Sequence, residues 1–175
     1  MSDFHTPLCD LLGSRYPIVQ TGMGYVTGSD LVAATTNAGG FGFLAGATIA
    51  ADQIEAEISR VRELTGDKPF GLNFHMFQPN AAQLLDLAVK HRIRAVSYGR
   101  GPDKKVIGRL RDAGIVCMPT VGALKHAQKA IEMGANVITI QGAEGGGHTG
   151  SVPTSVLLPQ VVDAVKVPVV AAGGF

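Results

Sequence analysis

The segment with the clearest capacity for chemistry is a glycine-rich stretch that runs from Gly142 to Gly150 and carries one histidine, His148. Five of its nine residues are glycine, so backbone amides can approach a flat or anionic ligand that side chains would otherwise keep away. An imidazole has an ordinary pKa of about 6.5 and exchanges protons readily near neutral pH. The alternative interpretation is a plain surface loop whose histidine has no role.

Two further glycine turns follow predicted strands. The turn Ala172-Gly173-Gly174 has the form of a phosphate cradle, in which successive amides face an anion. The turn Gly22-Met23-Gly24 could lie against a ligand, or could simply lead into a helix with Met23 packed at the mouth of the fold. A plain strand-to-helix turn is the alternative for the first of these as well.

Seven short apolar runs, rich in β-branched or aromatic residues, predict the strands that position these turns. The runs are 17–22, 41–45, 69–74, 95–98, 115–121, 137–141 and 167–172. Most are continuously apolar, which is typical of strands covered on both faces. They recur about every 25 residues, the period of a strand–helix unit.

Helical patterns separate the runs. Ile54, Ile58, Val61 and Leu64 share one predicted helix face. Asn80, with Gln83 three residues later, predicts a capping box. Ser29 is a further predicted N-cap.

The strand–helix repeat fits either an open doubly wound sheet or a (β/α)8 barrel. The turn after the first strand does not match the G-x-G-x-x-G fingerprint of dinucleotide-binding sheets, which favours the barrel. A complete barrel has eight strands. The prediction is therefore an α/β fold, a (β/α)8 TIM barrel truncated after about seven parallel strands. Residues 1–175 would form an incomplete barrel domain that lacks its C-terminal part.

Composition excludes several classes of protein. The net charge of +1 gives no basis for a nucleic-acid partner. With 46% hydrophobic and 17% charged residues, the chain is not disordered. We expect a soluble cytoplasmic protein with no membrane partner, because no apolar run approaches the ~20 residues of a membrane span and no signal peptide is evident. The spacing of histidines, carboxylates and the two cysteines predicts no metal site.

Taken together, these segments resemble the nitronate monooxygenase (2-nitropropane dioxygenase) family. The resemblance is carried by residues 16–24, 37–42, 69–73, 97–99, 141–150 and 170–174. It implies a TIM barrel that binds FMN and oxidises alkyl nitronates or nitroalkanes with O2 to a carbonyl compound and nitrite. It departs from some members at Met118-Pro119, where they carry lysine, and at Gln141, where they carry an acid.

The resemblance also implies roles for individual residues. His148 would be the catalytic base or would orient the bound nitronate. Gly22, Met23 and Gly24 would face the flavin ring, whereas Asn73 and Gln141 would hydrogen-bond its polar atoms. The implied cofactor set is completed by Gly146, Gly147, Ala172, Gly173 and Gly174.

Three alternatives stay open from the sequence. The same barrel could serve as an FMN-dependent enoyl-acyl-carrier-protein reductase or as an NAD(P)H:quinone reductase. The chain could also be an inactive truncated fragment without flavin. Its partners would be a small-molecule substrate and O2, and it could form a homo-oligomer.

Overall fold

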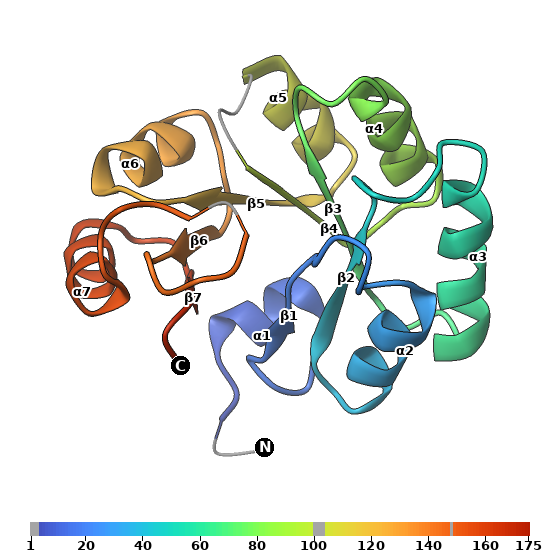
Figure 1. Ribbon diagram of the computed structural model, residues 1–175, viewed down its shortest axis with the longest axis horizontal. Helices are drawn as coiled ribbons and strands as arrows, with labels where there is room; N and C mark the ends of the chain where they lie inside the picture. The colour runs from blue at the N-terminus through green and yellow to red at the C-terminus, as the bar shows by residue number, and fades with distance from the viewer. Residues whose placement is uncertain (1–3, 100–103, 148) are drawn as a thin grey trace.

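A parallel sheet of seven strands curves into a nearly closed barrel with helices around its outside (Figure 1). This computed structural model describes residues 4–99, 104–147 and 149–175. The strands are β1 (Val19–Gln20), β2 (Phe41–Ala45), β3 (Gly71–His75), β4 (Ala95–Gly99), β5 (Val116–Val121), β6 (Ile138–Gln141) and β7 (Val169–Ala172). Each pairs in parallel with the next, in the order β1 to β7. The predicted fold class, a (β/α)8 barrel truncated after seven strands, is confirmed.

Helices alternate with the strands and form the outer layer. They are α1 (Pro7–Leu12), α2 (Ser29–Asn37), α3 (Ile54–Thr65), α4 (Ala81–Lys90), α5 (Lys104–Asp112), α6 (Leu124–Glu132) and α7 (Thr154–Ala164). Gly39, Gly66, Gly114 and Gly134 follow helices in the left-handed region, at φ between 62° and 106°. Glycine adopts this conformation without the strain of a Cβ, which explains where these helices end.

Inward-facing side chains fill the barrel. Successive strand residues point to opposite faces, and Gly71 is small because a Cβ there would lie 2.2 Å from Cε1 of Phe43. The rings of Phe41 and Phe43 pack edge to face, with centroids 5.1 Å apart. The interior cluster consists of Leu8, Leu12, Phe41, Phe43, Ala95, Val116, Met118 and Val137.

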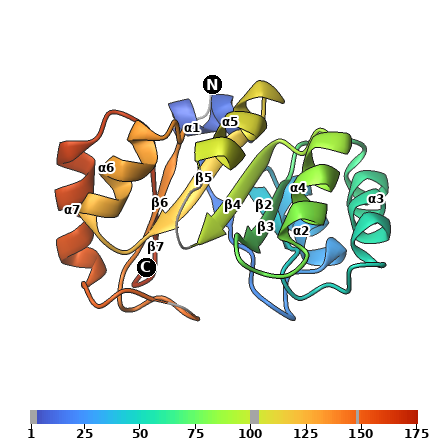
Figure 2. The same ribbon diagram turned by 90° about the horizontal axis from the view of Figure 1, so that it is seen from above.

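Helix α1 closes the end of the barrel opposite the strand arrowheads (Figure 2). No helix is predicted here from the sequence, although Pro7 occupies a favourable first-turn position and Gly13 ends the helix at φ 73°. Arg94, just before β4, holds α1 in place. Its Nε donates to the carbonyl of Leu11 at 2.6 Å, and its Nη2 donates to the carbonyl of Asp10 at 3.4 Å. A cation at a helix C-terminus satisfies carbonyls that the helix itself leaves open.

Replacing Arg94 with alanine should weaken the attachment of α1 to the end of the barrel. We expect Arg94→Ala to lower the free energy of unfolding by about 1–2 kcal/mol, because two helix-end carbonyls lose a charged donor. Urea unfolding measures the change. Lys125→Ala, which removes an exposed charge on α6, is the matched control and should change it by less than about 0.5 kcal/mol. Equal effects of the two substitutions would contradict the role of Arg94.

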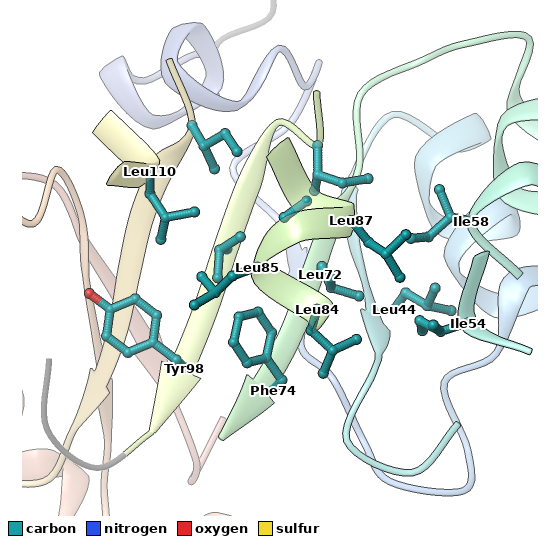
Figure 3. Packing of buried hydrophobic residues seen from close by; sticks show 14 of the residues in the cluster. Leu44, Ile54, Ile58, Leu72, Phe74, Leu84, Leu85, Leu87, Tyr98 and Leu110 are labelled. Atoms are coloured by element: carbon teal, nitrogen blue, oxygen red, sulfur yellow. The ribbon is translucent and has the colours of Figure 1, made fainter. Parts of the chain in front are cut away.

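Outward-facing strand residues form a second core beneath α3, α4 and α5. Figure 3 shows Leu72, Phe74 and Tyr98 of β3 and β4 packed with Leu84 and Leu85 of α4. Cys117 of β5 belongs to this layer, and burial raises the pKa of its thiol to about 11. A buried thiol with a raised pKa is inert.

Three details of the helices differ from the predictions. Leu64 is 43% exposed, and Thr65 takes the buried position at the end of the α3 face. Asn80 makes no capping hydrogen bond, because its Oδ1 accepts from Gln78 and Gln83 donates to the carbonyl of Ala51.

Ser29 is also not an N-cap. It is the first residue of α2, after Gly28, and its amide donates to Oε2 of Glu57 in α3 at 3.2 Å. A tertiary contact replaces the local cap that the sequence suggests.

None of the helices in the described part of the chain is long and apolar enough to cross a membrane.

Candidate functional site at the carboxyl ends of the strands

A cavity of about 220 Å³ opens between the strands of the barrel. Buried polar side chains of Ser97 and Thr139 face it together with Thr21 and Phe43, and the turn Ala172–Gly174 forms another part of its wall. Ligands of parallel α/β barrels bind at the carboxyl ends of the strands. With Thr21 after β1 and the 172–174 turn at the end of β7 in its wall, the cavity reaches this end of the barrel.

Asn73, Gly22 and Ser97 are brought together at this edge. The side-chain Nδ2 of Asn73 donates to the backbone carbonyl of Ser97 at 3.2 Å, and it also lies 3.3 Å from Oγ of Ser97. A Cβ at Gly22 would lie only 2.5 Å from Cβ of Asn73. Glycine is thus required at 22 because the first turn packs directly on the end of β3.

Met23 and Gly24 do not line the cavity in the structure. The Met23 amide donates to Oγ1 of Thr27 at 2.9 Å, and its side chain is 39% exposed. Gly24 packs toward Thr48, since a Cβ there would lie 3.0 Å from its Cγ2. Their roles toward a flavin ring stay predictions.

Gln141 holds the glycine-rich loop rather than facing open space. Its Nε2 donates to the carbonyl of Gly146 at 2.8 Å. A Cβ at Gly145 would lie 2.7 Å from the same Nε2. Gly147 has φ 73° and no neighbour within 4 Å of a built Cβ, so it lies at the open surface of the loop. Contact of Gln141, Gly146 and Gly147 with a cofactor stays a prediction.

The turn after β7 packs on this loop. Gly173 and Gly174 have φ of 88° and 82°, and a Cβ at Gly173 would lie 2.7 Å from the amide nitrogen of Gly145. Within the described residues, neither amide of the two glycines donates to a backbone carbonyl. These two donors are therefore available to an anion, which is the property that a phosphate cradle needs.

His148, the predicted catalytic residue, lies outside the described residues. The structure does describe loop residues before and after it. Gly145 packs against the turn after β7, and Gly150 packs against Gly122, which follows β5. The loop thus spans the carboxyl ends of β5, β6 and β7.

Two further residues pack at this site, Glu144 and Thr154, and neither was predicted from the sequence. The Thr154 amide donates to both carboxylate oxygens of Glu144, at 2.9 and 3.1 Å. Mainly through this backbone hydrogen bond, the pKa of Glu144 is lowered from its ordinary value of 4.5. The available signal was Pro153, the N-cap of α7, because proline has no side-chain acceptor and the helix needs one from elsewhere.

The residues present fit the phosphate of a flavin nucleotide. The paired positive-φ glycines of the β7 turn offer amides to a phosphate. The cavity is smaller than the ~300–1,000 Å³ of a typical small-molecule pocket. The described residues therefore supply part of such a pocket.

Fold and site together define a parallel α/β barrel with a candidate anion site at the carboxyl ends of its strands. Comparison with known proteins names the family. The model of the nitronate monooxygenase family matches residues 5–91 and 81–175. The chain belongs to the nitronate monooxygenase family.

Three known proteins illustrate the similarity. A curated relative from Rhodococcus jostii (strain RHA1), named (3aS,4S,5R,7aS)-5-hydroxy-7a-methyl-1-oxo-octahydro-1H-indene-4-carboxyl-CoA dehydrogenase, is 48% identical over 175 residues. The match covers 100% of this chain and 49% of the relative, so the chain spans about half the length of that protein.

Two solved structures are also similar. FabK from Thermotoga maritima is 34% identical with a TM-score of 0.93, over 98% of this chain and 55% of FabK. Nitroalkane oxidase from Streptomyces ansochromogenes is 34% identical with a TM-score of 0.87, over 97% of this chain and 61% of its own.

Proposed function

We propose that this protein is a flavin-dependent oxidoreductase that binds FMN at the carboxyl ends of its barrel strands. The observation that carries the proposal is the convergence of the Gly173-Gly174 turn, the Gly145 loop and the Asn73–Ser97 pair around one edge of the barrel. Family membership supports it, as do the similarities to FabK and nitroalkane oxidase. When bound, FMN would supply the acceptor for the electrons of the oxidised substrate.

The chain's own residues would hold the cofactor and handle the proton. Gly173 and Gly174 would donate amides to the phosphate, while Gly22 and Asn73 would border the ring. His148 would take a proton from the substrate or orient it, because an imidazole can act as a base near neutral pH. Buried Ser97 and Thr139 would present hydroxyls to the cavity.

Two substrate classes follow from the comparisons. Family membership favours an alkyl nitronate or nitroalkane, which O2 oxidises to a carbonyl compound and nitrite. The 48% identity with a hydroxy-indene-carboxyl-CoA dehydrogenase, against 34% with nitroalkane oxidase, favours oxidation of a hydroxyl-bearing bicyclic CoA thioester. Because the higher identity extends over the whole chain, we take the thioester as the stronger candidate substrate.

Parallel assays of the purified flavoprotein distinguish these substrates. Oxygen-dependent release of nitrite from propyl-2-nitronate would support the first class. Anaerobic bleaching of the flavin absorbance by a hydroxy bicyclic CoA thioester, with no nitrite from the nitronate, would support the second. Bleaching by NADH that is reversed by a quinone or an enoyl thioester would instead support the reductase alternatives.

Removal of the imidazole separates catalysis from cofactor binding. We expect His148→Ala to keep FMN bound and to lower kcat with a neutral nitroalkane or a hydroxyl substrate about 10²–10⁴-fold, the usual contribution of a general base. Stopped-flow measurement of flavin reduction tests this. His126→Ala, on the exposed surface of α6, is the matched control. Loss of FMN with normal turnover per bound flavin would contradict the assignment.

A further inference from the structure

Glu144 joins three segments of the candidate site that are separate in the sequence. Its carboxylate accepts from the amide of Thr154, the first residue of α7, at 2.9 Å. Thr154 in turn contacts the β7 turn, because its Oγ1 donates to the carbonyl of Gly173 at 2.7 Å. The same hydroxyl lies 3.0 Å from Oε2 of Glu144. One side chain thereby connects the glycine-rich loop, the start of α7 and the turn after β7.

The geometry of this junction explains its glycines. A Cβ at Gly142 would lie 1.9 Å from Oγ1 of Thr154. At Gly174 the φ of 82° favours glycine, and a Cβ there would lie in ordinary contact, 3.5 Å from Cβ of Glu144. A Cβ at Gly173 would collide with the backbone of Gly145. The junction therefore fixes how far the loop stands from the two amides that we assign to the phosphate.

A carboxylate suits this position for a second reason. The first amides of a helix have no partner within the helix, and a negative charge there is stabilised by the helix dipole. Pro153 has no side chain that could accept these donors. Glu144 supplies the acceptor from ten residues upstream, so it caps α7 and anchors its own loop with the same atoms.

We propose that Glu144 is a positioning residue for the cofactor phosphate. It is not itself among the residues that line the cavity, and it acts by holding the loop and Thr154 against the Gly173-Gly174 turn. This inference rests on the proposed function, since the phosphate is that of FMN. Above pH 4.5 the carboxylate is charged and the junction is complete. Because its pKa is lowered in the folded protein, this contribution is lost only as the pH falls through that lowered value.

The experiment compares Glu144→Ala with the matched control Glu132→Ala, which removes an exposed carboxylate at the end of α6. Riboflavin, which has the ring and ribityl chain without the phosphate, is the second ligand. We expect Glu144→Ala to weaken FMN binding about tenfold, as loss of one charged hydrogen bond would, with riboflavin affinity nearly unchanged. Glu132→Ala should change neither affinity. Flavin fluorescence quenching measures the affinity of each variant for FMN and for riboflavin.

Amide hydrogen exchange in the absence of flavin gives an independent readout. Exchange at Thr154 should accelerate about tenfold in Glu144→Ala, because its amide loses its acceptor. Glu144→Gln keeps the shape and one neutral acceptor. Glu144→Gln should change the exchange rate of Thr154 and the FMN affinity by an intermediate amount. It replaces Glu144→Ala in both measurements if the alanine variant does not fold.

The outcomes separate this inference from the proposed function. Failure of the unaltered protein to bind FMN would overturn both the proposed function and the phosphate role, while faster exchange at Thr154 would still establish the junction itself. Normal FMN binding with unchanged exchange in Glu144→Ala would overturn the inference alone. An equal loss of FMN and riboflavin affinity would also overturn it, because that result means general loosening of the site.

Discussion

Truncation of Phe43 to alanine should lower the free energy of unfolding by about 3–5 kcal/mol, the usual cost of emptying a buried aromatic position. Phe43 is 1% exposed, packs against Phe41 and lies over Gly71 in the barrel interior. The surrounding buried side chains come from α1, β4, β5 and Val137 just before β6, so the barrel cannot close the space by moving a single element. Urea unfolding followed by circular dichroism gives the change.

The control for this prediction is Phe4→Ala. Phe4 is 71% exposed, so its removal should change the free energy of unfolding by less than about 0.5 kcal/mol. A small effect of Phe43→Ala, similar to that of the control, would mean that the barrel interior does not carry the stability of the fold.

Substitution of Gly173 by alanine should disrupt the proposed phosphate contact while leaving the barrel folded. The φ of 88° is unfavourable for any residue with a Cβ, and the new Cβ would lie 2.7 Å from the nitrogen of Gly145 and 2.8 Å from its Cα. Both neighbours are backbone atoms, so the turn and the loop must move apart. We expect FMN affinity to fall roughly 10–100-fold, corresponding to the strain of about 1–3 kcal/mol at such a position. Isothermal titration with FMN measures it.

Gly66→Ala separates the strain of a positive φ from the steric clash with Gly145. Gly66 has φ 62° after α3, and a built Cβ has no neighbour within 4 Å. This variant should lose about 1 kcal/mol of stability and keep its FMN affinity. If both variants bind FMN as the unaltered protein does, the β7 turn is not the phosphate site.

The sheet was predictable because burial on both faces leaves a strong local signal. The predicted run 41–45 coincides with β2, and the other strands differ at their ends by one or two residues. Proline explains some of these differences. Pro17 and Pro69 precede the paired residues of β1 and β3, whereas Pro119 lies inside β5 opposite Tyr98 without ending the strand.

The tertiary contacts of the site were not predictable from local pattern. The capping roles of Asn80 and Ser29 were wrong because Gln78 and Glu57 provide the contacts that short sequence motifs assign locally. Helix α1 was missed because its apolar residues are stabilised by the barrel interior rather than by a long helical repeat. Glycine spacing did place Gly22 and Gly173 at the same edge, since parallel strands bring their carboxyl ends together.

The central claim is that glycine turns far apart in the sequence form one FMN site at the carboxyl ends of the strands. Chemical-shift mapping of backbone amides during an FMN titration tests it most directly. We expect saturable shifts at Gly22, Asn73, Gly145, Gly173 and Gly174, with none at Gly66, Gly108 or Gly114. Shifts confined to the surface between α2 and α3, around Ser29 and Glu57, or no shifts at all, would contradict it.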